Sequence, residues 1–242
     1  MTPPWRGSGP TSESGSAQAP GNDGDRVAGR HRLLIATGNA HKIREMRTLL
    51  DPDVWEIVTP AEAGIADLEV VEDGDSFQAN AAKKARAYAN AAGLPALADD
   101  SGLEVDALDG APGVYSARYA GNGATDADNR AQLLDALADV PAAKRGARFR
   151  AVVALSFPYG PNVRFGEGAA EGRIATDARG ESGFGYDPIF ELPDGRRMAE
   201  LTSDEKNAIS HRGRAVRDLA WALDALAASL PPDDAAGGST VP

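Results

Sequence analysis

Residues 94–103 read LPALADDSGL: an apolar run typical of a strand, then two adjacent carboxylates and a turn of small residues. We expect the strand to end at Ala98, which would place Asp99 and Asp100 at its carboxyl end. A buried carboxylate without a partner is costly, whereas Mg²⁺ commonly takes one or two carboxylates together with substrate phosphates. The stretch therefore predicts a cation site at the end of a strand, with the solvated start of a loop as the alternative.

The segments before this stretch alternate between strand and helix patterns, which predicts an α/β fold. Apolar runs suggest the strands, and turn and capping residues bound the helices. The expected elements are strands at 33–37 and 54–58, a helix between Gly38-Asn39 and Asp51-Pro52, and an Ala-rich helix that Asp75 or Ser76 caps and Gly93 ends.

The segments after this stretch predict a hairpin between two helices. Thr125 and Asp128 resemble a capping box that begins a helix, and Pro141 is expected to end it. Two longer strands, 149–157 and 163–174, should form an antiparallel hairpin, so the sheet should be mixed. Apolar residues at helical spacing predict one long final helix that reaches Leu230.

The composition excludes several classes of protein. The chain has 242 residues, a formal charge of −11, no Cys, and three His without zinc-ligand spacing. Such acidic charge argues against binding long nucleic acids, although a local cluster of Lys and Arg could hold a small phosphorylated ligand. No apolar run could span a bilayer, so we expect no membrane partner and a cytoplasmic protein.

The two ends of the chain differ from its middle. Residues 1–30 and 231–242 are rich in small and polar residues, a composition that buries too little apolar area to fold. We expect a disordered leader over 1–30, one α/β domain over 31–230 and a disordered tail over 231–242.

The turn after the first strand could hold phosphate. Its residues are Thr37-Gly38-Asn39-Ala40-His41-Lys42. A helix that begins here offers free backbone N–H groups and the positive end of its dipole, and Lys42 adds a charge. The alternative is an ordinary turn between a strand and a helix.

The Ala-rich helix carries an unusual lysine. Phe77, Asn80 and Lys84 share one helix face. Lys84 is either a second phosphate ligand, with Asn80 in a supporting role, or a lysine whose head reaches water. Glu72 lies in an acidic turn just upstream, and such turns are usually merely exposed.

A Gly-rich aromatic loop and a basic cluster could recognise a flat ligand. In Gly183-Phe184-Gly185-Tyr186-Asp187-Pro188, Phe184 could stack on a base and Asp187 could accept from a ring N–H. The alternative is a tight loop that packs its aromatic residues into the core.

Lys206, His211 and Arg212 are three donors near the last helix. Five residues of helix rotate by about 140° beyond a full turn, so Lys206 and His211 need a helix break to share a face. We expect Ser210 to cap the long helix at that break. The alternative is a set of solvated basic residues.

Taken together, these motifs resemble the inosine triphosphate pyrophosphatases over about residues 33–230. The matching motifs, in chain order, are Thr37-Gly38-Asn39 with Lys42, Ala98-Asp99-Asp100-Ser101-Gly102-Leu103, Phe184-Gly185-Tyr186-Asp187-Pro188, and Lys206 with His211-Arg212. The resemblance implies an elongated, curved mixed sheet flanked by helices, with two lobes and a nucleotide cleft between them, as a homodimer.

The resemblance also implies a role for each motif. Glu72 and Asp100 would bind Mg²⁺, and Asp100 would accept the proton of the attacking water, with Asp99 as acidic support. The phosphate contacts would be Thr37, Gly38, Asn39, Ala40, His41, Lys42 and Lys84. The base and sugar contacts would be Ser101, Phe184, Gly185, Tyr186, Asp187, Lys206, His211 and Arg212.

The implied reaction is hydrolysis of ITP, dITP and XTP to the monophosphate and pyrophosphate, which keeps deaminated purines out of DNA and RNA. Cationic donors would pair with the 6-oxo group of these bases and face the amino group of adenine unfavourably. The alternatives are a pyrophosphatase of related fold for modified pyrimidine or methylated nucleotides, a nucleotide sensor without turnover, and a structural module.

Overall fold

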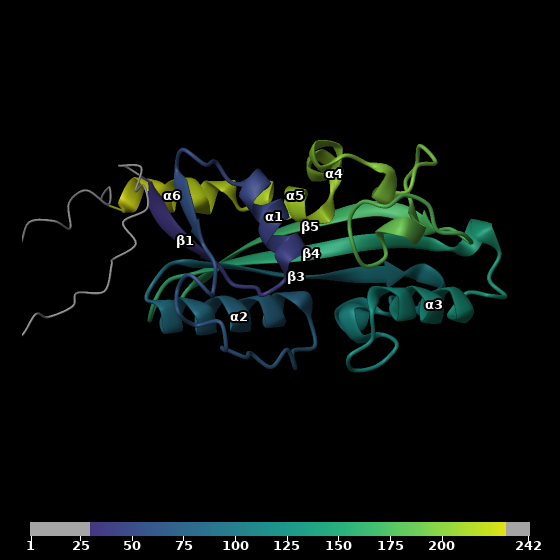
Figure 1. Cartoon of the computed structure of the whole chain (residues 1–242), viewed down its shortest axis with the longest axis horizontal. Helices are drawn as coiled ribbons and strands as arrows, with labels where there is room; N and C mark the ends of the chain where they lie inside the picture. Colours follow the sequence, from purple (N-terminus) through teal and green to yellow (C-terminus); the bar gives the residue numbers. More distant parts are fainter. Residues whose placement is uncertain (1–29, 231–242) are drawn as a thin grey trace, which may run out of the picture.

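The computed structural model describes residues 30–230, so the predicted leader and tail lie outside the described residues, apart from Arg30. A six-stranded sheet runs through this part of the chain in the order β2-β1-β3-β4-β5-β6 (Figure 1). Strand β1 (His31–Ile35) pairs in parallel with β2 (Trp55–Val58) and β3 (Ala96–Val105). The other pairings are antiparallel, which confirms the predicted mixed sheet.

The first two helices begin where their capping residues predict. Helix α1 (Ala40–Leu49) follows Asn39, whose side chain accepts hydrogen bonds from the first-turn amides. Helix α2 (Phe77–Ala92) is capped by Ser76, one of the two candidates, and ends at Gly93.

The sequence predicts that β3 ends at Ala98, and this prediction is wrong. The strand continues to Val105, so Asp99 and Asp100 lie in mid-strand. The reason is non-local: β1 pairs only with Ala96 and Leu97, whereas β4 (Gly146–Ser156) pairs with β3 along its whole length. Beyond the end of β1, no strand among residues 30–230 pairs with this edge of β3, and the two carboxylates lie there.

The second half of the fold contains the predicted hairpin. Strands β4 and β5 (Val163–Ile174) pair antiparallel along their lengths, and β4 begins three residues earlier than expected. Helix α3 (Asp126–Ala136) has the capping box but ends before Pro141, with Leu137 as its C-terminal cap. The 3₁₀-helix η2 (Gly113–Arg118) and the short strand β6 (Phe190–Glu191) have no counterpart among the predicted elements.

The segment after Ser210, predicted as one long helix, forms two helices. Helix α4 (Ser203–Ile209) ends at Ser210, and the Ser210 hydroxyl then caps α5 (His211–Asp218), which confirms the predicted break. Helix α6 (Ala220–Ser229) follows after an interruption at Leu219. Residues of α5 and α6 join the same core cluster, so the interruption lets both helices keep their apolar faces on the sheet.

Helix α5 lies unusually close to β5. A Cβ on Gly168 would lie 2.1 Å from the carbonyl oxygen of His211, and one on Gly166 would lie 2.2 Å from that of Ala215. Real Cβ atoms do not approach other atoms so closely. The absence of side chains at these two strand positions therefore allows the backbones to touch.

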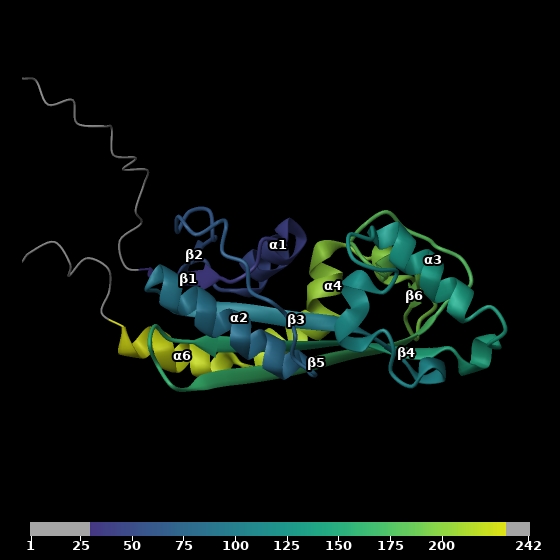
Figure 2. The ribbon, with the colours of Figure 1, turned by 90° about the horizontal axis from the view of Figure 1, so that it is seen from below.

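Helices cover both faces of the sheet and form two lobes. Figures 1 and 2 show α2 and α3 on one face and α1, α4, α5 and α6 on the other. Strands β1 and β2 with α1, α2 and α6 make one lobe, and α3 and β6 lie at the opposite end. This arrangement confirms the predicted fold class. None of the helices between residues 30 and 230 has the length and apolar character to cross a membrane.

Candidate active site

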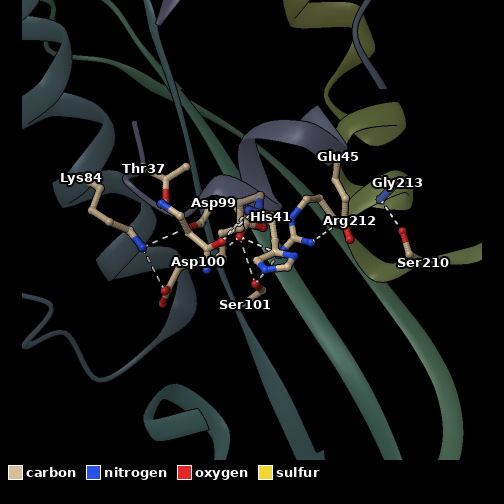
Figure 3. Close-up of polar contacts among 12 residues, drawn as sticks. Thr37, His41, Glu45, Lys84, Asp99, Asp100, Ser101, Ser210, Arg212 and Gly213 are labelled. Carbon is tan, nitrogen blue, oxygen red and sulfur yellow. Dashed lines mark hydrogen bonds and ion pairs between the residues drawn. The ribbon is translucent and has the colours of Figure 1, made fainter. Parts of the chain in front are cut away.

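The Asp99-Asp100 pair divides between the two faces of β3, because successive side chains of a strand point to opposite sides. Lys84 of α2 donates to Asp100 Oδ1 at 3.1 Å, while Lys42 of α1 and Arg212 of α5 contact Asp99 Oδ2 at 2.7 and 3.1 Å. Figure 3 shows Lys84 and Arg212 on opposite sides of the pair. The two carboxylates therefore belong to different ion-pair clusters.

Asp100 lies in an acidic cluster with one cation. The ammonium of Lys84 also donates to Glu72 Oε2 at 3.0 Å and to the Asp99 carbonyl at 2.9 Å. Burial, together with the neighbouring Glu72 carboxylate, raises the pKa of Asp100 to about 6, although Lys84 opposes the shift. Asp100 is thus a carboxyl group suited to exchanging a proton near neutral pH.

The donor set beside Lys84 fits a magnesium ion that shares its ligands with a substrate. Within residues 30–230, no cluster of three His, Cys, Asp or Glu side chains could hold a metal alone. Glu72 and Asp100 offer two carboxylates, and Asp100 Oδ2 is buried there without a hydrogen-bond partner. Mg²⁺ typically accepts one or two carboxylates and completes its shell with phosphates and water.

The loop that carries Glu72 is held in place by three groups. Asn80 Oδ1 accepts from the Gly74 amide at 2.8 Å, which gives Asn80 a supporting contact. Arg118 donates to the Glu72 carbonyl at 3.2 Å. Lys83 pairs with Asp73 at 2.7 Å on the surface.

Asp99 is an ionised hub between two helices. It is fully buried, yet Arg212 and Lys42 outweigh burial and hold the pKa of its carboxyl well below the usual range. Ser101 adds a hydroxyl donor to Asp99 Oδ2 at 3.0 Å. Asp99 thereby ties the start of α1 to the start of α5.

The turn at the start of α1 differs from the expectation in one respect. Asn39 Oδ1 accepts from the amides of His41 and Lys42 at 2.8 and 3.3 Å, so these two N–H groups are capped rather than free. Thr37 Oγ1 in turn accepts from the Asn39 amide at 3.1 Å. These two amides are therefore not what the turn offers a phosphate, whereas the Lys42 ammonium and the helix dipole still can attract one.

A cavity of about 140 Å³ lies beside the hub, between the two lobes. It brings together all eight of the predicted base-binding and sugar-binding residues with two from the phosphate turn. Its predicted lining residues are Asn39, Lys42, Ser101, Phe184, Gly185, Tyr186, Asp187, Lys206, His211 and Arg212. Glu72, Lys84 and Asp100 are not among its lining residues, and His41 lines a neighbouring cavity.

Phe184 presents its ring among positive groups. The Lys206 ammonium lies 4.9 Å and the Arg212 guanidinium 5.8 Å from its centroid. Asp187 Oδ2 accepts from the Phe184 amide at 2.9 Å and from Lys206 at 2.7 Å. That oxygen is therefore shared by two donors of the protein, so a ring N–H would have to be accepted by the other oxygen of Asp187.

Glu45 is a site residue that the sequence reasoning missed. It pairs with Lys206 at 2.8 Å and with Arg212, and these two cations lower its pKa although burial opposes them. The sequence feature that could have indicated Glu45 is its position one helical turn after His41, beside the apolar stripe of α1. Its role depends on partners more than 150 positions away, which spacing alone does not reveal.

Seven further lining residues were not among the predicted contacts. They are Gly102, Leu103, Ser116, Ala117, Asp126, Asn129 and Phe149. Gly102 and Leu103 belong to the quoted motif 98–103, but no contact was assigned to them. Asp126 and Asn129 belong to α3, where the capping box predicts a helix start and nothing more.

His211 is a neutral histidine in the cavity wall. It stacks on Phe149 with ring centroids 4.9 Å apart, and its Nδ1 is buried without a hydrogen-bond partner. Burial, reinforced by Arg212 and then by Lys206 and Lys42, lowers its pKa well below 6.5, and Asp99 opposes this only in part. The ring can therefore donate from one nitrogen and accept at the other.

We expect the free energy of unfolding to decrease as the pH falls below 6.5, because of His211. The unfolded chain takes up a proton on this residue near pH 6.5, whereas the folded chain does not. The stability that the neutral ring contributes is complete above pH 6.5 and declines as the pH falls. Between pH 7.5 and 5.5 the loss should be about 1.4 kcal/mol.

Urea unfolding of the wild type and His211→Gln at both pH values measures this contribution. Because His31 and His41 are present in both proteins, the difference between them isolates His211. An equal pH dependence in the two proteins would show that folded His211 titrates normally.

Comparison with known proteins adds sequence and structural relatives. The Ham1 family model matches residues 33–222. The chain is 50% identical over 201 residues to the dITP/XTP pyrophosphatase of Methylococcus capsulatus, which covers 81% of this chain and 98% of that protein. It is 50% identical over 197 residues to the protein of the same name from Salmonella typhimurium, with the same coverage.

Solved structures give the same result. A HAM1 protein from Coxiella burnetii matches with a TM-score of 0.73 at 43% identity, covering 81% of this chain and 99% of that one. The Ham1 protein of Staphylococcus aureus matches with a TM-score of 0.71 at 39% identity and the same coverage. These similarities confirm the resemblance that the motifs predict: the chain belongs to the Ham1 family.

Proposed function

We propose that this protein is a Mg²⁺-dependent pyrophosphatase that hydrolyses ITP, dITP and XTP to the monophosphate and pyrophosphate. The observation that carries the proposal is the buried carboxyl of Asp100, which lies beside Glu72 and Lys84 next to a cavity lined by cations and aromatic rings. The similar proteins from Methylococcus and Salmonella are named dITP/XTP pyrophosphatases, which supports dITP and XTP as substrates. In a cell this activity would keep deaminated purines out of DNA and RNA.

Asp100 is the group that we assign to the attacking water. Its pKa of about 6 leaves it ionised at neutral pH, so it can take a proton from a water aligned with the bond between the α and β phosphates. Glu72 and Asp100 would hold the magnesium ion, which supplies neutralising charge for the phosphates when it is bound. A sensor without turnover would not need a carboxyl group of this kind.

Two lysines would hold the triphosphate. Lys84 lies between Glu72 and Asp100, and Lys42 pairs with Asp99, so both ammonium groups lie beside the two carboxylates, where the reacting phosphates would bind. Each can neutralise negative charge that develops on the leaving pyrophosphate. Thr37 to His41 would complete this end of the site.

The base would be recognised at Phe184. Its ring offers a stacking surface, and Lys206 and Arg212 lie beside that ring as donors for a 6-oxo group. Adenine would place an amino donor against these donors, and unpaired buried donors can discriminate by factors of roughly 10⁴ or more. Asp187, Ser101, Gly185, Tyr186 and His211 complete this wall.

A panel of triphosphates tests the proposal. We expect Mg²⁺-dependent release of pyrophosphate, not orthophosphate, from ITP, dITP and XTP at rates far above those for ATP and GTP. Chelation of the metal with EDTA should stop the reaction. Equal rates on all purines would refute the specificity, and faster turnover of modified pyrimidine or methylated nucleotides would favour the related-fold alternative.

The remaining expectations stay predictions. A homodimer is tested by the mass of the full chain in light scattering, and the cytoplasmic location by fractionation of the cells that make it.

A further inference from the structure

The loop that carries Phe184 is held by α3 through both backbone groups of one residue. Asp126 Oδ2 accepts a hydrogen bond from the Gly185 amide at 2.7 Å. Arg130 Nη1 donates to the Gly185 carbonyl, also at 2.7 Å. We call this pair of contacts the Gly185 clasp.

The two side chains of the clasp, Asp126 and Arg130, carry opposite charges that suit the two backbone groups of Gly185. Asp126 and Arg130 are four residues apart on α3, so they lie on the same face of the helix. Hydrogen bonds to charged groups are shorter and stronger than neutral ones. One helix face therefore grips a single residue with a negative acceptor and a positive donor.

Gly185 has the backbone conformation that the clasp requires. Its φ is +60°, in the left-handed region that favours glycine, and a Cβ would meet nothing within 4 Å. Packing therefore does not demand a glycine here. The conformation turns the amide and the carbonyl of Gly185 toward the two side chains on α3.

Gly185 and Asp126 of the clasp line the same cavity as Lys206 and Arg212. On one side of Gly185, Phe184 meets Lys206, which the neighbouring Asp187 also binds. On the other side, Tyr186 donates from its hydroxyl to the Ser116 carbonyl at 2.8 Å. Gly185 thus lies between Phe184, which contacts Lys206, and Tyr186, which contacts η2.

Helix α3 is itself anchored to this part of the fold. Asn129 Oδ1 accepts from the Ala120 amide at 2.8 Å, and Asn129 Nδ2 donates to the Ala117 carbonyl at 3.2 Å. Asn129 is buried, and its two hydrogen bonds join α3 to η2 and to the turn that follows η2. The clasp therefore fastens the Phe184 loop to a fixed element.

We infer that Asp126 and Arg130 are positioning residues for base recognition: by clasping Gly185 they hold the Phe184 ring where a purine base stacks. This inference rests on the proposed function, because it assigns the Phe184 wall to the base. The ligand class is a nucleotide with a purine ring, and the phosphate end of the site should be independent of the clasp.

Kinetics of the full-length protein separates the two ends of the site. The variants are Asp126→Ala, Arg130→Ala and the double variant, and the matched controls are Asp135→Ala on the same helix and Arg86→Ala on α2, both exposed positions. The probes are ITP as substrate and inorganic tripolyphosphate as a competitive inhibitor without a base. Melting temperatures check that every variant is folded.

We expect each single clasp variant to raise the KM for ITP about tenfold, in line with the loss of one charge-assisted hydrogen bond. The inhibition constant of tripolyphosphate should stay within about twofold of the wild-type value, since α1 and α2 hold the phosphates. Asp126→Asn keeps an acceptor oxygen for the Gly185 amide and should restore most of the affinity. The two control variants should behave as the wild type.

Three outcomes would overturn the inference. An unchanged KM in the double variant would show that the loop keeps its place without α3. Equal losses for ITP and tripolyphosphate would show a general structural role instead. A wild type that releases no pyrophosphate from ITP would refute the proposed function and the inference with it, whereas an active wild type with normal clasp variants would refute the inference alone.

Discussion

Replacing Asp100 by Asn is expected to lower the rate of pyrophosphate release from ITP by roughly 10³-fold while nucleotide binding remains measurable. The substitution keeps the size of the side chain and its contact with Lys84 but removes the proton acceptor and one magnesium ligand. Initial rates with saturating ITP and Mg²⁺ give the first quantity. The rise in melting temperature with added ITP gives the second.

Asp99→Asn is the informative comparison for this variant. Asp99 contacts Lys42 and Arg212 rather than the Glu72 cluster, so its neutralisation should lower stability and binding more than the chemical step. An Asp100→Asn protein with the wild-type rate would show that another group activates the water. A rate that falls only for Asp99→Asn would reverse the assignment of the two carboxylates.

Replacing Glu45 by Ala is expected to lower the free energy of unfolding by about 3 kcal/mol. Removal of one partner from a buried ion pair leaves its charge uncompensated, and Glu45 serves two buried cations, Lys206 and Arg212. In the variant Lys206 still pairs with Asp187, and Arg212 still pairs with Asp99. The loss of stability should therefore lie at the lower end of the range that is usual for a broken buried ion pair. For a domain of this size the melting temperature should fall by about 6–12 °C.

Glu69→Ala is a matched control, because this glutamate is exposed, and its free energy of unfolding should stay within about 0.5 kcal/mol of the wild-type value. Urea unfolding at pH 7.5 measures both variants. The Glu45 variant should also need more ITP for half-maximal rate, since the two donors lose a common anchor. A Glu45 variant as stable as the control would show that the two cations do not depend on this carboxylate.

The predictable parts of the fold were those governed by neighbouring residues. The caps at Ser76, Thr125 and Ser210 each accept from an amide three positions away, so their side-chain chemistry identifies them. The end of β3 was not predictable, because it depends on pairing with β4, about fifty residues later. The interruption at Leu219 likewise depends on how two helices fit one sheet.

The candidate site shows the same division. Residue types and the family resemblance together suggested the cations and aromatic rings that line the cavity, and the structure brings these together. Glu45, Asp126 and Arg130 were missed, because each acts on a residue more than fifty positions away. Asp187 was expected to accept from a ring N–H, and its contact with Lys206 became visible only in three dimensions.

The close approach of β5 to α5 has a consequence for how substitutions should affect the cavity. His211 and Arg212 stand on the first turn of α5, whose backbone meets the strand at Gly168. A methyl group added at Gly168 would act as a wedge and lift that turn from the sheet, moving both side chains with it. Substitutions where the α5 backbone contacts β5 should therefore disturb the cavity. Gly168 is such a position, although it is not among the cavity's lining residues.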